Sequence, residues 1–249
     1  MSIETIKNYL NQIKEVSDYV YLHVLGEPLL HKDIDEIFNI TDKLNLNVQL
    51  VTNGTLLSKN LNILKHKSLR KLSISLHSIS STNISADYFK TIDSIIENNN
   101  PFYIELRMYD KDNLSDDLKK YRDSLYDRYN VETTVKTNSY KLKDNVYVYY
   151  SNLFDWPNIN NEIFSNDGYC HGGIDQLAIL HDGKVTLCCL DPSGHNTIGD
   201  LKKDTLLDIL NSDKYKEVVS NFKNRKLTYE LCKKCSYRLR FDDKHNLKQ

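Results

Sequence analysis

The chain has 249 residues, which is long enough for one large domain or two modest domains with hydrophobic cores. Hydrophobic residues make up 40% and charged residues 27%, ordinary values for a soluble globular protein, and 33 Lys and Arg against 34 Asp and Glu give a net charge of -1. This balance argues against a nucleic-acid partner, and no apolar run approaches the roughly 20 residues that cross a bilayer. Because the N-terminus also lacks the layout of a signal peptide, we expect a cytoplasmic protein with no membrane partner.

Helix and strand patterns alternate from residue 3 to residue 150. Apolar residues at helical spacing predict helices, at residues 3–16, 33–44, 57–65, 85–98 and 113–129. Nearly continuous apolar runs predict buried strands, at residues 19–25, 48–51, 72–77, 102–107 and 146–150. The short connections between these segments indicate βαβ units, and therefore an α/β fold with parallel strands.

Polar side chains stand where these expected strands end, at Glu27, Asn53, Ser75 or His77, and Arg107. Since the carboxyl ends of parallel strands form the ligand-binding edge of α/β folds, these side chains are expected to line one wall of a polar site. Three of them also have an ordinary structural explanation: Glu27 as a helix cap, Asn53 as part of a turn, and Arg107 in a surface ion pair.

The cysteines are confined to the last third of the chain, at Cys170, Cys188, Cys189, Cys232 and Cys235. Between the first two, residues 176–181 and 184–190 read as two strands joined by Asp182-Gly183, a dipeptide that favours a tight hairpin. This hairpin is expected to place Cys188 on a rigid strand and to bring Cys170 nearby.

The two-residue spacer of Cys232-Lys-Lys-Cys235 lets both sulfurs face one ion or cluster. With Cys170 and Cys188 this makes four ligands, and Cys189 is left over. Adjacent residues on a strand point to opposite faces, so Cys188 and Cys189 are not expected to bind one centre equally. Cys188 is chosen because its spacing from Gly183 matches the family pattern described below. Four thiolates suit tetrahedral zinc or a 4Fe-4S cluster, and the spacing does not separate the two. Disulfides are disfavoured because nothing marks the chain for secretion, and isolated buried thiols rarely include this spacing.

The chain is expected to divide near Trp156-Pro157 and the asparagine-rich stretch that follows. The expected parts are a barrel domain over residues 1–157, a cysteine-rich domain over residues 168–241 and a solvated tail over residues 242–249. After the hairpin, the cysteine-rich domain is expected to contain a turn at 198–201 and helices at 205–210 and 213–223.

The segment from Leu22 to His31, which contains Gly26-Glu27-Pro28, resembles the GGEP region of radical S-adenosylmethionine (SAM) enzymes, with Leu25 in place of the first glycine. Thr52-Asn53-Gly54 resembles the end of the next strand of that family. In the last third, the pattern of Cys170, Gly183, Cys188 and Cys232-x-x-Cys235 resembles the SPASM or twitch module, which carries an auxiliary 4Fe-4S cluster. The resemblance covers residues 18–240.

This resemblance implies a partial (β/α)6 radical-SAM-type barrel that lacks its first strand, followed by a small cysteine-rich α+β SPASM-like domain. SAM would bind at the carboxyl ends of the strands, with the backbone around Gly26 and Glu27 at its methionyl amino group and with Ser75 and Arg107 at its carboxylate or ribose. The implied cofactor-binding residues are Gly26, Glu27, Pro28, Thr52, Asn53, Ser75 and Arg107. The implied ligands of the auxiliary cluster are Cys170, Cys188, Cys232 and Cys235.

One departure from the family pattern concerns the chemistry itself. Radical SAM enzymes hold their catalytic 4Fe-4S cluster with a CxxxCxxC motif after the first strand, and no cysteine precedes Cys170 here. We expect either an N-terminally truncated form of a longer enzyme, in which case SAM serves only the full-length form, or a short protein that keeps the auxiliary cluster. As it stands, the chain is not expected to cleave SAM. Position 241 is Phe, so only one auxiliary cluster is expected.

The leading hypothesis is a radical SAM/SPASM-type oxidoreductase or modifying enzyme that acts on a peptide or small molecule and exchanges electrons with a donor protein. The alternative is a non-catalytic electron-transfer or interaction module that holds a 4Fe-4S cluster or zinc, so enzyme status stays open. With cysteine at all four positions, the cluster is expected to transfer electrons or to support the fold rather than to bind substrate. No motif indicates the substrate.

Overall fold

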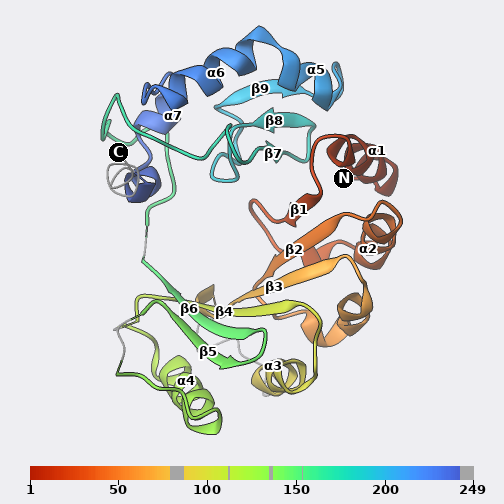
Figure 1. Cartoon of the computed structure of the whole chain (residues 1–249), viewed down its shortest axis with the longest axis vertical. Coiled ribbons are helices and arrows are strands. Elements are labelled where there is room, and N and C mark those ends of the chain that lie inside the picture. The colour runs from red at the N-terminus through yellow and green to blue at the C-terminus, as the bar shows by residue number, and fades with distance from the viewer. Residues whose placement is uncertain (79–86, 112, 135–136, 153, 242–249) are drawn as a thin grey trace. The chain divides into compact units, whose positions relative to one another are not determined.

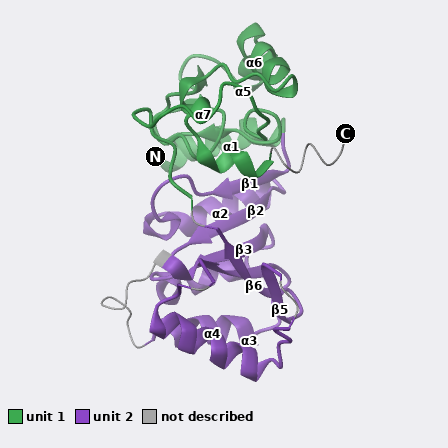
Figure 2. Ribbon diagram, turned by 90° about the vertical axis from the view of Figure 1, so that its left-hand side faces the viewer, with its two compact units in different colours: residues 1–16, 154–249 green, residues 17–153 purple. Residues whose placement is uncertain are grey.

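The computed structural model describes residues 1–78, 87–111, 113–134, 137–152 and 154–241, so the expected tail over residues 242–249 lies outside the described residues. The chain forms two compact units (Figure 2). Residues 17–153 form the sheet unit, and residues 1–16 together with residues 154–249 form the cysteine unit. No described helix is both long enough and apolar enough to cross a membrane.

The sheet unit is built on a six-stranded sheet in the order β1-β2-β3-β4-β6-β5. The strands are β1 (Tyr19–Leu22), β2 (Asn47–Thr52), β3 (Leu69–Ser75), β4 (Tyr103–Tyr109), β5 (Ser139–Lys143) and β6 (Val146–Ser151). Each neighbouring pair from β1 to β6 is parallel, and β5 alone runs antiparallel, against β6. The expected α/β class and parallel strand pairing are confirmed.

Strand β5 was not expected, although its sequence carries a signal. The segment Ser-Tyr-Lys-Leu-Lys alternates polar and apolar residues, and its apolar members Tyr140 and Leu142 are buried. An edge strand with one buried face shows this alternation, unlike the apolar runs of central strands.

Helices cover one face of this sheet (Figure 1). They are α2 (Ile34–Lys43), α3 (Tyr88–Glu97) and α4 (Asp116–Arg128), and short 3-10 helices connect the strands at Pro28–Leu30, Leu57–Lys59, Leu61–Lys65 and Leu76–Ser78. Alternate residues of β2, β4, β5 and β6 are buried; in β4 these are Ile104, Leu106 and Met108. Because side chains alternate across a strand, Glu105 and Arg107 lie on the opposite, polar face of the sheet.

The cysteine unit has a small antiparallel sheet of strands β7 (Ala178–Ile179), β8 (Lys184–Thr186) and β9 (Thr197–Asp200). Its helices are α1 (Ile3–Lys14), α5 (Leu206–Asn211), α6 (Asp213–Lys223) and α7 (Glu230–Lys233), with a 3-10 turn at Ser236–Arg238. A core of buried apolar side chains joins the sheet to these helices, and consists of Val185, Leu187, Ile198, Leu206, Ile209, Val218, Phe222 and Leu227.

Two local expectations for this unit are corrected. The segment 198–201 was expected to be a turn, but residues 197–200 form β9, in which Gly199 lets Ile209 approach: a Cβ at Gly199 would lie 2.5 Å from Ile209 atoms. The second expected strand was too long, because β8 ends at Thr186 and Cys188 therefore lies in the bend that follows. Cys188 and Cys189 are therefore not neighbours on a strand, and the choice of Cys188 rests on its spacing from Gly183.

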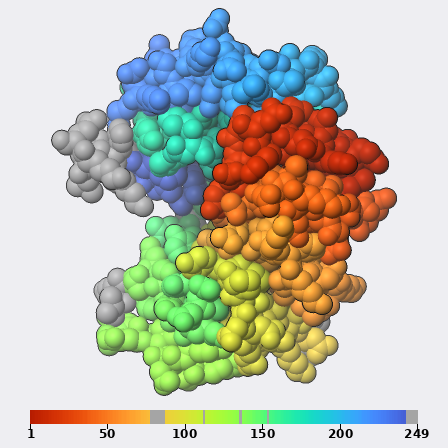
Figure 3. Space-filling view, turned by 45° about the vertical axis from the view of Figure 1, so that its right-hand side comes forward, coloured from red at the N-terminus to blue at the C-terminus, as the bar shows by residue number. Residues whose placement is uncertain are grey.

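Helix α1 belongs to the cysteine unit, although residues 1–157 were expected to form one barrel domain. The side chain of Gln12 accepts a hydrogen bond from the N–H of Leu206 at 2.8 Å, and Ile13 packs against the core of the unit. In the space-filling view, α1 (red) lies directly against the light-blue segment that carries α5 (Figure 3). These contacts join residues almost 200 positions apart, so no local sequence pattern predicts them.

Truncation of the core of the cysteine unit tests this packing. Phe222 is fully buried, so Phe222→Ala should lower the free energy of unfolding of the unit by about 3–5 kcal/mol, from lost burial and the cavity left behind. Urea denaturation followed by circular dichroism measures this loss. Leu207→Ala, at an exposed position of α5, should change it by less than about 0.5 kcal/mol. Equal effects of the two substitutions would contradict the assigned core.

Candidate functional site

The ends of β1 and β2 are joined by the carboxylate of Glu27. One oxygen accepts from the Leu29 N–H at 3.0 Å and from the Thr52 hydroxyl at 2.7 Å, and the other accepts from the Asn53 N–H at 2.7 Å. The contact with Leu29 makes Glu27 the N-cap of the following 3-10 helix, which is the ordinary structural role expected for it from the sequence. The other two contacts show that Glu27 also ties the two strand ends together.

The loop after β2 is packed closely around Gly54. Its φ of +80° suits glycine, and a Cβ at this position would lie 2.9 Å from the hydroxyl of Tyr88. That hydroxyl donates to the carbonyl of Asn53 at 2.9 Å, and burial together with the charge of Glu27 raises the pKa of Tyr88. The tyrosine thus stays a neutral donor that holds this loop against α3.

Ser75 and Arg107 are neighbours in the register between β3 and β4, so the structure brings these two expected site residues together. The guanidinium of Arg107 lies 3.7 Å from the carboxylate of Glu105 and is about one-quarter exposed. Glu105 has closer partners in the ammonium of Lys71 at 2.6 Å and the hydroxyl of Ser73 at 3.1 Å. The expected ion pair of Arg107 exists, but its geometry is looser than that of the Lys71 pair.

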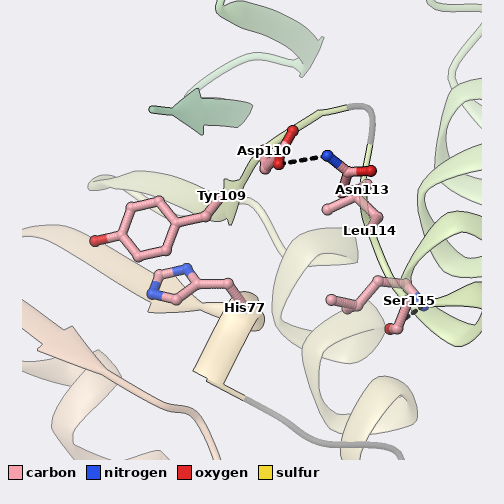
Figure 4. A pocket seen from close by; sticks show the side chains of 7 residues that line it. His77, Tyr109, Asp110, Asn113, Leu114 and Ser115 are labelled. Carbon is pink, nitrogen blue, oxygen red and sulfur yellow. Dashed lines mark hydrogen bonds between the residues drawn. The ribbon is translucent and has the colours of Figure 1, made fainter. Parts of the chain in front are cut away.

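A cavity of about 260 Å³ opens beyond the same strand ends (Figure 4). The rings of His77 and Tyr109, which line it, are tilted against each other with centroids 3.7 Å apart, and Asn113 donates to the carboxylate of Asp110 at 2.7 Å. The lining residues are His77, Tyr109, Asp110, Asn113, Leu114, Ser115 and Leu118. Apart from His77, sequence reasoning missed this cavity, because its wall includes the loop before α4, which has no motif.

His77 is neutral at neutral pH. Its Nδ1 lies 3.3 Å from the carbonyl of Arg107, a contact that requires this nitrogen to carry the hydrogen. Burial is the main cause that lowers the pKa of His77 to about 4, and the positive charge of Arg107 acts in the same direction. The Nε2 atom is therefore available as an acceptor rather than as a cationic donor.

The four expected cysteine ligands come together in the cysteine unit from three parts of the chain. Cys170 precedes a tight loop whose Gly173 N–H donates to the carbonyl of Leu187 at 2.8 Å, next to Cys188. Gly172 separates the two thiols: a Cβ there would lie 3.5 Å from Cys170 Sγ and 3.4 Å from Cys188 Cβ. The other two, Cys232 and Cys235, lie in α7 and just after it.

Each of these four sulfurs accepts a hydrogen bond from nitrogen. Backbone N–H groups donate to three of them: Gly172 to Cys170 at 3.3 Å, Leu190 to Cys188, and Tyr237 and Arg238 to Cys235. The side-chain amide of Asn196 donates to Cys232 at 3.3 Å. Such donors favour the thiolate form, which is the form that binds metals.

The thiols are half-buried close to one another, and this makes them poor anions when no cation is bound. Burial is the main cause that raises the pKa of Cys188 to about 12, and the nearby sulfurs of Cys170 and Cys189 act in the same direction. Burial also raises the pKa of Cys232 well above its ordinary value, with Cys188 and Cys170 as the next causes. For Cys235 the rise in pKa by burial is offset in part by backbone N–H groups and by Arg238 and Arg240.

The described side chains contain no group of three or more His, Cys, Asp or Glu placed to hold a single metal ion. Sulfurs around one tetrahedral zinc lie about 3.8 Å apart, as follows from a Zn–S bond of about 2.3 Å. In an iron-sulfur cluster each sulfur binds a different iron, which requires a wider separation. The proposed ligands are four cysteines whose sulfurs accept N–H hydrogen bonds around a small glycine loop. This arrangement fits the wider sulfur separation of an iron-sulfur cluster.

A family model also matches the segment that contains these cysteines. The SPASM family, described as an iron-sulfur cluster-binding domain, matches residues 170–236. This match spans all five cysteines. No curated protein sequence matches the chain significantly.

Solved structures share the fold of the whole chain. BtrN in an open conformation superposes with a TM-score of 0.57 at 16% identity, over 95% of this chain and 80% of that chain. SuiB from Streptococcus suis, also solved with its precursor peptide SuiA, gives 0.56 at 17% identity over 93% and 65%. The tagged anSMEcpe with bound AdoMet gives 0.53 at 14% identity over 95% and 74%.

The junction at Glu27 is testable by one isosteric change. Glu27→Gln places an amide NH2 where the carboxylate accepts N–H and O–H groups, so two donors face each other. We expect the free energy of unfolding of the sheet unit to fall by about 1–3 kcal/mol in urea denaturation, the cost of an unsatisfied polar group in this part-buried junction. Glu132→Gln, at an exposed loop position, should stay within about 0.5 kcal/mol of the wild type. A Glu27→Gln protein as stable as this control would contradict the junction.

The environment of His77 predicts a dependence of stability on pH. Its pKa of about 4 in the folded chain lies below its ordinary 6.5, so as the pH falls from about 6.5 to 4 the unfolded chain takes up the proton first and stability is lost. His77→Asn removes this proton uptake, and its free energy of unfolding should fall less steeply over that interval. Above about pH 7.5 the two proteins should show the same pH dependence. Identical slopes below pH 6.5 would show that His77 is not shielded in this way.

Proposed function

We propose that this chain is a radical SAM/SPASM-type protein and that it holds one 4Fe-4S cluster through Cys170, Cys188, Cys232 and Cys235. The observation that carries the proposal is the set of N–H donors, one or more to each of these four sulfurs. Buried thiolates need a compensating positive centre, and the irons of a cluster supply it. Cys189, half-buried beside Cys188, is assigned no ligand role.

Zinc is the competing occupant, and two features disfavour it. The described thiols are not gathered around one ion, and the matching family is described as binding an iron-sulfur cluster. All four ligands would be cysteines, so the cluster would have no iron open to substrate. Its proposed roles are therefore electron transfer and support of the fold, with an electron donor protein as partner.

The polar edge of the sheet unit is the proposed binding face for SAM. The chain has Gly26, Glu27 and Pro28 at the end of β1, Thr52 and Asn53 at the end of β2, and Ser75 and Arg107 at the ends of β3 and β4. An arginine beside a serine hydroxyl suits a carboxylate or a ribose, and the loop held by Glu27 presents backbone groups to an amino group. The cavity beyond His77 continues this face, with room for part of a nucleoside.

The reaction class follows from the family rather than from a group seen in the chain. A longer form would use SAM for oxidoreductase chemistry or for modification of a peptide or small molecule, and the SuiB structure with its precursor peptide supports the peptide. The given sequence has no CxxxCxxC motif, so SAM cleavage is not assigned to it as it stands. The second candidate is a non-catalytic electron-transfer or interaction module, favoured by a site built entirely of cysteines.

Metal analysis of cysteine variants tests the cluster. Anaerobically purified wild-type protein should contain about four irons and four sulfides per chain. Cys232→Ala and Cys235→Ala should each lose most of this iron and lower the stability of the cysteine unit, because cluster binding and folding are coupled.

Cys189→Ala is the matched control and should keep the full iron and sulfide content. One zinc per chain without iron would contradict the proposal. Loss of iron in Cys189→Ala but not in Cys188→Ala would overturn the choice between these two neighbours.

A further inference from the structure

Asn196 is a buried amide beside the proposed cluster ligands. Its side chain is 1% exposed, and its Nδ2 donates to Cys232 Sγ at 3.3 Å. Its Oδ1 is buried and has no hydrogen-bond partner among the described residues. With the amide reversed, this oxygen would face a sulfur that must be a thiolate to bind iron, so the observed orientation is the favourable one.

The position of Asn196 is fixed by the loop between Cys189 and β9. The carboxylate of Asp191 is fully buried and accepts from the His195 N–H at 2.9 Å and from the Asn196 N–H at 2.6 Å. On the other side, the hydroxyl of Thr197 donates to the carbonyl of Gly194 at 2.6 Å. The amide is therefore held toward Cys232 by a loop with its own internal hydrogen bonds, as a preorganised donor should be.

Cys232 differs from the other three cysteines in where its donor comes from. Cys170, Cys188 and Cys235 accept from backbone N–H groups two or three residues further along the chain. Cys232 lies inside α7, where the corresponding N–H of Lys234 donates to the carbonyls of Glu230 and Leu231. A helical cysteine cannot use the next backbone groups, and Asn196 supplies the missing donor from 36 residues away.

We propose that Asn196 is a positioning residue of the iron-sulfur site, whose N–H bond to Cys232 raises the reduction potential of the cluster. This rests on the proposed cluster. Reduction adds negative charge to the cluster and its sulfurs, so a donor aimed at one sulfur stabilises the reduced form more than the oxidised form. The other three sulfurs accept from backbone N–H groups, whereas the donor to Cys232 is a side chain that a single substitution removes.

The test is a redox titration of the holoprotein and three variants, followed by absorbance or electron paramagnetic resonance. Asn196→Ala removes the donor, and Asn196→Asp removes it at nearly constant shape and adds an acceptor. The matched control is Thr186→Val, which removes another buried side-chain hydrogen bond, to the carbonyl of Cys188, without touching a sulfur. Iron and sulfide content is measured on every sample.

The account predicts full cluster content in all four proteins, a more negative midpoint potential in Asn196→Ala, and a larger negative shift in Asn196→Asp. The potential of Thr186→Val should stay at the wild-type value. Loaded Asn196 variants with an unchanged potential would overturn the tuning role while leaving the cluster assignment intact. Failure of both Asn196 variants to hold iron, with Thr186→Val loaded, would make Asn196 a folding residue and also overturn it. Wild-type protein without a cluster would overturn both proposals.

Discussion

The partial burial of four thiols in one small unit is the constraint on which the C-terminal part of the structure depends. Desolvation, and after it the neighbouring sulfurs, raise the pKa values of Cys188 and Cys232, so these thiols resist ionisation. They become stable ligands only where N–H groups point at each sulfur and a positive centre is bound. The tight loop at Gly172, the bend after β8 and the 3-10 turn after α7 meet these needs with backbone groups, and Asn196 supplies the donor to Cys232.

A different kind of constraint shapes the sheet unit. Its parallel strands bury their apolar residues under helices and leave a polar face at their carboxyl ends. Loops at such ends have few neighbours to define them, and here a single carboxylate, that of Glu27, joins two of them through three short hydrogen bonds. The proposed cofactor face is thus arranged before a ligand binds, which lowers the entropic cost of binding.

Much of the architecture was predictable because its signals are local. Apolar runs indicated the parallel strands, and Asp182-Gly183 indicated the β7–β8 turn. The Cys232–Cys235 spacing led to the thiolate site that is proposed above. Features that rest on distant contacts were not predictable: α1 joins the cysteine unit through Leu206, and β9 pairs where a turn was expected. Asn196 was missed for the same reason, because no pattern in the sequence around it predicts a contact with a cysteine 36 positions later.

X-ray absorption spectroscopy at the iron and zinc edges, on protein purified without oxygen, tests the central claim most directly. The account predicts iron with sulfur neighbours only and a short iron–iron distance, because four cysteines and the bridging sulfides complete every coordination sphere. Zinc at the thiolates without iron would contradict the account. Iron with a nitrogen or oxygen neighbour would contradict the assignment of all four cysteines as ligands.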